Sequence, residues 1–255
     1  MVALTGTDLS HDIRVVEDAR RSLAIADRLV VLHDLAPREV PARYRAKVRV
    51  IRQSAKGPRS ASRPSTRRFE VAVVGHLRDV KDPLRTALAA RRLPPSSRVH
   101  VLHAGRALDH AAERAALREA RVNPRYSWLG EVTPARAHRL IAHSRVLVLT
   151  SKSEGGANVL GEAAMCGTPI LASDIPAARS ALGARYPALF PVGDDVALAR
   201  LLDRAERDPR WLADLARHVR ARRPLFDERA ERDAWRALRG ELTRAAPAPP
   251  AGSQR

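Results

Sequence analysis

Cysteine, lysine and long apolar stretches are all scarce in this sequence of 255 residues. Cys166 is the only cysteine, which excludes an internal disulfide and favours a reducing compartment. No stretch approaches the ~20 consecutive apolar residues that a transmembrane helix needs. The first eight residues lack a basic segment followed by an apolar run. We therefore predict no signal peptide, no membrane span and a cytoplasmic location.

Acidic residues are outnumbered, since 28 Asp and Glu stand against 46 Lys and Arg, for a formal charge of +18. The arginines are spread along the chain and often sit beside acids, as in Glu228-Arg229. A nucleic-acid-binding protein more often gathers its charge on one face or tail. We interpret the charge as a compositional bias and predict no nucleic-acid partner. The net field still favours anionic ligands in a cleft.

Strands and helices alternate along most of the chain. Residues 1–54 contain three short apolar runs typical of strands, at 2–5, 29–33 and 48–51, and a helical segment at 17–26. Residues 55–68 are rich in proline and serine without acids, which predicts a linker. Residues 69–225 repeat strand and helix at the spacing of a doubly wound α/β domain. The predicted strands of this part lie at 70–75, 98–103, 128–130, 146–149 and 169–172, and the predicted helices lie at 83–93, 110–121, 134–143 and 158–166, with almost all of 194–244 helical. A helix over 226–244 and a disordered tail over 245–255 complete the predicted organisation.

The run SKSEGGANVLGEA, at 151–163, follows the apolar strand predicted at 146–149 and opens a helix. Doubly wound sheets bind ligands beyond the carboxyl ends of their strands, where this run lies. Gly155 and Gly156 allow a close approach of the backbone to a ligand. Asn158 marks a helix start, where free N–H groups favour an anion. The pattern predicts a phosphate-binding turn.

Two acidic residues flank this turn. Glu154 lies in the loop, and Glu162 lies four residues beyond Asn158 on the same helical face. Because carboxylates repel phosphate, they would meet hydroxyl-rich parts of a ligand, as a nucleotide-sugar offers on both sides of its diphosphate. The alternative is a structural glycine turn with Glu162 solvated on its helix.

This Glu-x7-Glu spacing resembles the nucleotide-sugar signature of retaining GT-B glycosyltransferases of family four. The following segment MCGTPILASDIPA, at 165–177, is similar to the same family's pattern. The resemblance implies that Glu154 contacts the transferred sugar and Glu162 the ribose. It also implies two Rossmann-like domains, with residues 1–54 as a partial acceptor-side domain. In this class of enzyme a terminal helix crosses back to the first domain, which implies the same for 226–244, the alternative being a simple surface helix. On this comparison we expect the sequence to be incomplete at its N-terminus.

A second stretch, VVGHLRDVKDP at 73–83, also resembles this family. There a Gly-Arg pair is followed five residues later by Lys, and the two cations neutralise the diphosphate. Lys81 occupies the lysine position here, whereas His76 replaces the arginine and Arg78 is a candidate substitute. The alternatives are a loop histidine satisfied by backbone and a solvated lysine.

Two further loops follow predicted strands. Gly130 and Glu131 lie where backbone groups of the family contact the base. Thr5, Gly6, Thr7 and Asp8 would lie on the acceptor side, with Asp8 either binding the acceptor, transferring a proton or capping a turn. We predict Glu154, Lys81 and Asp8 as catalytic residues. The candidate donor-binding residues are Gly75, His76, Arg78, Lys81, Gly130, Glu131, Glu154, Gly155, Gly156, Ala157, Asn158 and Glu162.

Segments across residues 2–242, among them RLVVLHDL, GHLRDVKDP and NPRYSWLGEV, are similar to selenosugar synthases of selenoneine biosynthesis. This resemblance implies transfer of a sugar from UDP-N-acetylglucosamine or UDP-glucose to selenophosphate. We predict no cofactor and no metal, since no Asp-x-Asp pair is present. The alternatives are a related glycosyltransferase with an ordinary sugar or lipid acceptor, an inactive fragment, and a basic nucleic-acid-binding protein with a vestigial sugar site. The oligomeric state is not predicted.

Overall fold

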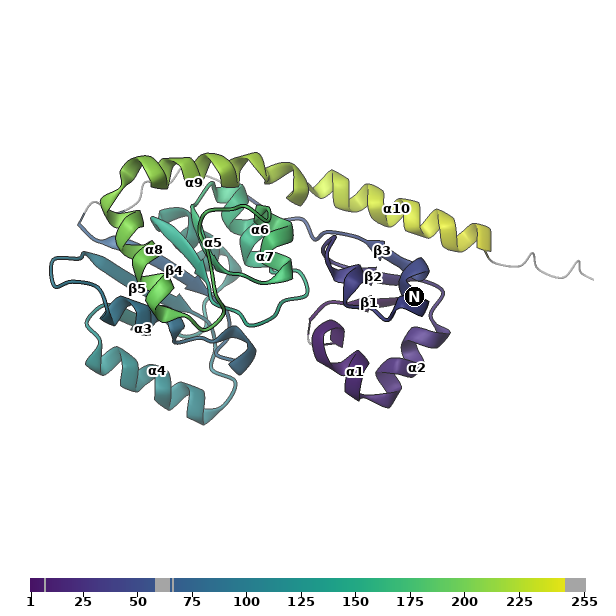
Figure 1. Cartoon of the computed structure of the whole chain (residues 1–255), viewed down its shortest axis with the longest axis horizontal. Coiled ribbons are helices and arrows are strands. Elements are labelled where there is room, and N and C mark those ends of the chain that lie inside the picture. The colour runs from purple at the N-terminus through teal and green to yellow at the C-terminus, as the bar shows by residue number, and fades with distance from the viewer. Residues whose placement is uncertain (7, 58–64, 66, 246–255) are drawn as a thin grey trace, which may run out of the picture.

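The computed structural model describes residues 1–6, 8–57, 65 and 67–245, which form two parallel sheets joined side by side (Figure 1). Thr7, most of the predicted linker (58–64 and 66) and the tail at 246–255 lie outside the described residues. Within the described part of the chain, no helix is long and apolar enough to cross a membrane.

The first sheet has three parallel strands in the order β1-β2-β3, namely β1 (Val2–Leu4), β2 (Leu29–Val31) and β3 (Val48–Val50). Helices α1 (Ile13–Val15) and α2 (Glu17–Ile25) connect β1 to β2. One face of the sheet buries a small cluster that includes Leu9, Ile13 and Leu23. Each of the three strands and the helix α2 was predicted to within two residues, because each is a short apolar run bounded by polar residues.

The second sheet has six parallel strands in the order β6-β5-β4-β7-β8-β9. In chain order this is 3-2-1-4-5-6, the doubly wound arrangement whose connections diverge between β4 and β7. The strands of this sheet are β4 (Phe69–Val74), β5 (Val99–Ala104), β6 (Tyr126–Trp128), β7 (Val146–Leu149), β8 (Ile170–Ser173) and β9 (Leu189–Phe190). The helices of this part are α3 (Arg85–Arg91), α4 (His110–Val122), α5 (Pro134–His143), α6 (Asn158–Cys166), α7 (Pro176–Leu182), α8 (Asp195–Arg207) and α9 (Pro209–Ala221).

Helices α5 and α6 and strand β7 begin and end at the residues that the sequence predicted. The strand predicted at 128–130 lies instead at 126–128, because Gly130 adopts a positive φ of 66° and has left the extended conformation. Strand β9 and helix α7 were not predicted. The long helical region from 194 is divided at Asp208, whose side chain accepts a hydrogen bond from the amide of Trp211 and caps the start of α9.

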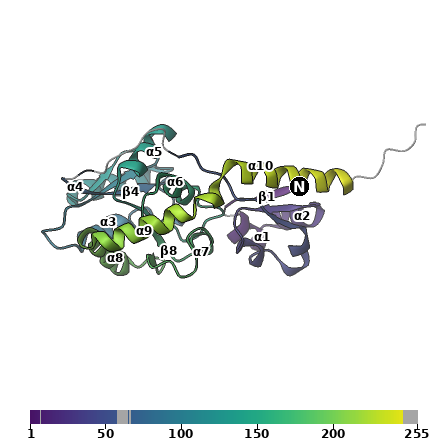
Figure 2. The same ribbon diagram turned by 90° about the horizontal axis from the view of Figure 1, so that it is seen from above.

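Helix α10 (Glu228–Ala245) leaves the second sheet and runs along the first, on the side opposite α1 and α2 (Figures 1 and 2). Leu238 of this helix is buried against Val30 and Ile51. Glu241 pairs with Arg28 and Arg49, at 3.0 and 2.7 Å. The predicted terminal helix therefore crosses from one sheet to the other and supplies the second apolar layer of the first sheet.

The start of the predicted linker is ordered. The amide of Ala55 donates a hydrogen bond to the carbonyl of Phe226, at 3.1 Å, and its side chain packs against the core of the second sheet. This contact fixes the chain as it leaves β3. It places Gln53 and Ser54 between the two sheets, where Ser54 donates its amide proton to Glu231 of α10.

Candidate functional site

A cavity of about 290 Å³ lies at the carboxyl ends of the central strands of the second sheet. Thr5, which follows β1, and Gln53, which follows β3, close it from the first sheet. The residues lining it are Thr5, Gln53, Val74, Lys81, Glu154, Gly156, Ala157, Asn158, Val159 and Glu162. The structure thus brings together two stretches that the sequence singled out separately, 73–83 and 151–163, at the switch point of the sheet.

Glu154 and Lys81 form the most buried ion pair of the cavity. Lys81 Nζ lies 2.5 Å from Glu154 Oε1, and the Ser151 hydroxyl donates to the same oxygen at 2.5 Å. The Glu154 side chain is 10% exposed and that of Lys81 is 30% exposed. Because a partly desolvated pair orders both groups, this arrangement presents one cation and one carboxylate in fixed positions.

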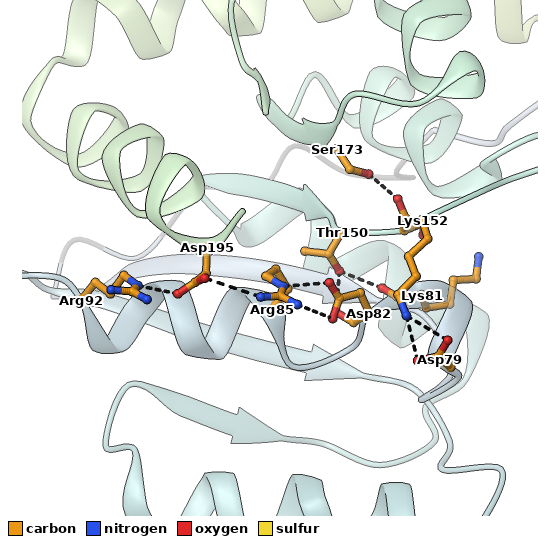
Figure 3. Close-up of polar contacts among 10 residues, drawn as sticks. Asp79, Lys81, Asp82, Arg85, Arg92, Thr150, Lys152, Ser173 and Asp195 are labelled. Carbon is orange, nitrogen blue, oxygen red and sulfur yellow. Dashed lines mark hydrogen bonds and ion pairs between the residues drawn. The ribbon is translucent and has the colours of Figure 1, made fainter. Parts of the chain in front are cut away.

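The loop that carries Lys81 is tied to the loop after β7 (Figure 3). The Thr150 hydroxyl donates to the carbonyls of Lys81 and Asp82, at 2.9 and 3.0 Å. The amide of Lys152 donates to the carbonyl of Val80, and its ammonium group contacts the exposed Asp79 carboxylate at 2.8 Å. Asp82 holds a positive φ of 45°, a conformation that costs energy for a residue with a Cβ and is maintained by these contacts.

The start of α6 faces the cavity without a side-chain cap. Ala157, at the N-cap position, has a positive φ of 48°, and no side chain accepts from the first amides of the helix. Asn158 lies at the first helical position and is exposed. Ala157 and Asp82 are the only non-glycine residues with positive φ in the described part of the chain, and both flank the cavity. This helix end is electrostatically suited to an anion.

Glu162 lies one turn into α6 and also faces the cavity. Its Oε1 atom is 3.3 Å from Nε2 of His138 on the neighbouring helix α5. The side chains of the two residues are 28% and 26% exposed. The charge of Glu162 also reaches Cys166, whose pKa is raised to about 11, first by burial and then by this carboxylate. The sulfur is therefore a protonated, partly buried thiol on the same helix.

The two glycines of the turn meet the first sheet. A Cβ on Gly155 would lie 2.0 Å from the carbonyl oxygen of Thr5, and one on Gly156 would lie 2.7 Å from Cδ1 of Leu32. The sequence predicted that these glycines admit a ligand. At Gly155 the group that approaches is the backbone at Thr5. A side chain at position 155 would overlap this backbone, so the contact between the two parts of the chain requires glycine there.

Other predicted donor residues lie at the margin. His76 accepts the amide proton of Arg106 on Nδ1, at 3.1 Å, as the backbone-satisfied alternative predicted, and is exposed. With Gly75 and Lys81 it lines an adjoining cavity of about 20 Å³. Arg78, Gly130 and Glu131 line neither cavity, and Arg78 and Glu131 are exposed. The structure therefore separates these three residues from the central group.

On the first sheet, Asp8 is engaged by backbone. Its carboxylate accepts the amide protons of Thr5, at 2.8 and 3.1 Å, and of Gly6, at 2.5 Å. This geometry corresponds to the turn-capping role that the sequence left open for Asp8. Thr5 reaches the cavity, whereas Gly6 and Asp8 do not line it, and Thr7 lies outside the described residues.

Sequence reasoning missed Gln53, His138 and Ser151, because no local motif marks them. It also missed His33, which follows β2, is 2% exposed and has no hydrogen-bond partner on either ring nitrogen among the described residues. Burial lowers its pKa to about 4. Within the described ranges, no group of three or more His, Cys, Asp or Glu residues could hold a metal ion.

The fold defines an α/β protein of the GT-B class with a cavity at the switch point of its larger sheet. The profile of the family described as "Glycosyl transferases group 1" matches residues 58–222. This chain belongs to that family and is a glycosyltransferase. No curated protein sequence matches the chain.

Solved structures with the same fold include the following three. HepE from Anabaena, solved with UDP and glucose, has a TM-score of 0.75 and 18% identity over 95% of this chain and 71% of its own. Sucrose-phosphate synthase from Thermosynechococcus elongatus has a TM-score of 0.69 and 23% identity, over 92% and 66%. The pneumococcal O-GlcNAc transferase GtfA, solved with UDP and GlcNAc, has a TM-score of 0.73 and 16% identity, over 94% and 52%.

Proposed function

We propose that the cavity binds a UDP-sugar and that the chain transfers the sugar to selenophosphate. The observation that carries the donor proposal is the grouping of Lys81, Glu154, Asn158 and Glu162 around one cavity at the uncapped start of α6. The relatives HepE and GtfA, which share the fold, were solved with UDP. A nucleoside diphosphate offers an anion for the helix start and hydroxyls for the two carboxylates.

Each group has a distinct role in this proposal. Glu162 accepts hydrogen bonds from the ribose hydroxyls, and Glu154 accepts them from the transferred sugar. Lys81 and the amides at the start of α6 face the diphosphate. As the bond between the anomeric carbon and the diphosphate oxygen breaks, negative charge grows on the leaving group, and these fixed positive groups stabilise it. His76 contributes from the adjoining cavity, which Arg78 does not line.

Selenophosphate as acceptor is supported by the similarity to selenosugar synthases and by the chemistry of the acceptor side. Thr5 and Gln53, which face the cavity from the first sheet, are uncharged. A selenophosphate anion attacks through selenium without general-base assistance, so the new carbon–selenium bond forms as UDP departs. The engagement of Asp8 by two backbone amides is consistent with a mechanism that does not use it as a base.

Calorimetric titration with UDP tests the donor site. We expect micromolar binding by the wild-type chain, and Glu162→Ala should weaken it by about 1.5–3 kcal/mol, the range for a charged hydrogen bond. This corresponds to roughly 10- to 150-fold in affinity. Glu113→Ala, on the distant helix α4, is the matched control and should bind as the wild type does. A change below about twofold in Glu162→Ala would remove Glu162 from the site.

Product analysis tests the acceptor. The wild-type chain is incubated with UDP-glucose or UDP-N-acetylglucosamine and either selenophosphate or a sugar phosphate, and UDP release is measured. Release that requires selenophosphate supports the proposal. Release with the sugar phosphate instead would favour an ordinary acceptor, in line with the fold shared with sucrose-phosphate synthase.

A further inference from the structure

Glu154 and Glu162 are supported in different ways. Glu154 is held by the Lys81 ammonium and the Ser151 hydroxyl, both from loops that line the site. Glu162 has a single side-chain partner among the described residues, Nε2 of His138, at 3.3 Å. A glutamate on a helix has three side-chain torsions to fix, so one contact decides where its carboxylate points.

We propose that His138 is a positioning residue that orients Glu162 toward the ribose of the donor. His138 lies on α5 and does not line the cavity, whereas Glu162 does. The imidazole therefore acts through the carboxylate and not on the nucleotide. This inference rests on the proposed donor site, and it names the group that makes that site selective for a ribose diol.

One oxygen of the Glu162 carboxylate contacts His138, and the other is free to bind the ligand. Nε2 of His138 lies 3.3 Å from Oε1, within ion-pair distance. Oε2 and the second lone pair of Oε1 stay available for hydroxyl donors. Since a carboxylate accepts several hydrogen bonds, it can take both ribose hydroxyls while remaining anchored to α5. A second residue that fixes a ligand-contacting group commonly matters nearly as much as the group itself.

Binding of two probes separates positioning from structure. UDP carries the ribose diol, and 2′,3′-dideoxyuridine diphosphate lacks it. We expect His138→Ala to weaken UDP binding on the order of 10-fold, because the Glu162 carboxylate loses the contact that orders it, and to leave binding of the dideoxy probe within about twofold. His138→Gln, which places an amide N–H near the position of Nε2, should recover most of the UDP affinity.

Two further variants serve as controls. His143 lies five residues along the same helix, is exposed, and lines a separate cavity with Leu102 and Arg139. His143→Ala should therefore leave the affinities for both probes unchanged. In a Glu162→Ala background, His138→Ala should have no further effect on UDP, because the group it orients is gone.

The outcomes are distinct. Equal weakening of both probes by His138→Ala would assign it a general structural role and overturn the proposal, as would unchanged UDP binding. Wild-type protein that binds no UDP would overturn the proposed donor site itself and this inference with it. UDP binding that depends on Glu162 but not on His138 would leave the donor site intact and overturn only the positioning role.

Discussion

The two sheets of this molecule are stabilised by different means. The second sheet has six strands and one continuous apolar core that includes residues from nearly all of its helices. The first has three strands, a small cluster on one face, and on the other face a layer that α10 completes with Leu238. The side of the cavity formed by the second sheet therefore rests on a large apolar core, whereas the side formed by the first sheet depends on α10 for its second apolar layer.

Contacts between the sheets include polar and backbone-mediated ones. Arg52 donates to the hydroxyl of Ser180 on α7, at 2.8 Å, and this hydroxyl donates to the Asp34 carboxylate. Gly155 meets the carbonyl of Thr5. Polar interfaces between parts of one chain resemble transient protein–protein contacts, which separate more readily than an apolar core. The cavity is therefore assembled from one stable wall, which the second sheet forms, and one conditional wall, which the first sheet forms.

The largest expected effect concerns the conditional wall. Leu238→Ala should destabilise the first sheet by about 2–5 kcal/mol, because it removes a side chain that is only 3% exposed and leaves a cavity against Val30 and Ile51. Hydrogen exchange should show faster opening of β2 and β3 with β4 and β7 unchanged. Leu108→Ala, at a half-exposed position, is the control. Equal loss of protection in both sheets would show that they unfold as one unit and would erase the contrast.

The next effect concerns the stable wall. Lys81→Ala should lower kcat by about 10²–10³-fold in transfer from a UDP-sugar, the usual cost of removing one group that stabilises developing charge. Steady-state UDP release measures it. Lys152→Ala is the matched control, because this lysine pairs with the exposed Asp79 outside the cavity (Figure 3). Similar losses in both variants would contradict the assignment of Lys81 to the leaving group.

A smaller effect is expected where the walls meet. Gly155→Ala places a Cβ 2.0 Å from the carbonyl oxygen of Thr5, and relief of this overlap by separation of the sheets should cost about 1–3 kcal/mol. We expect slower sugar transfer, and faster exchange of the Thr5 and Gly6 amides. Gly240→Ala, within α10, has no backbone neighbour that close and should be neutral or slightly stabilising. Unchanged exchange at Thr5 would mean that the contact is not maintained in solution.

The smallest effect is the pH dependence of the α10 contact. Hydrogen bonds from Arg49 and then Arg28 lower the pKa of Glu241 from 4.5 to about 2. The folded state therefore favours the ionised carboxylate, and its stabilisation is complete above about pH 4.5 and is lost as pH falls toward 2. The gap in denaturation midpoint between wild type and Glu241→Gln should close over this range, and high salt should narrow it at neutral pH. Parallel pH curves would show that the pair contributes nothing.

Much of the second sheet could be predicted because its signals are local. The apolar strand at 146–149 and the helices at 134–143 and 158–166 are marked by hydrophobic runs, by Pro134 at a first helical turn, and by Gly167 at a helix end. The spacing of Glu154 and Glu162 likewise places Glu154 in the loop and Glu162 on the helix, with both residues lining the cavity. Two-residue strands such as β9 have too few residues to show a pattern, which is why it was missed.

The contacts across the cavity could not be predicted, since they join residues distant in the chain. Gln53 and Glu154 share one cavity although about a hundred residues separate them, and His138 meets Glu162 only because α5 and α6 pack together. The same holds for Gly155, because the carbonyl of Thr5 leaves no room for a side chain at this position. No local propensity encodes such a pairing, because it depends on the order of strands in the sheet.

The sequence by itself determined the α/β class, the glycine turn at 151–163 with its two carboxylates, and the membership of a glycosyltransferase family, because these follow from short-range patterns of apolar, glycine and acidic residues. Only the tertiary structure decided which of the candidate residues meet. It pairs Lys81 with Glu154, engages the Asp8 carboxylate with a backbone amide, and leaves Arg78 exposed. The physical reason is that local pattern sets the direction of each side chain, whereas packing of sheets and helices sets the distances between them.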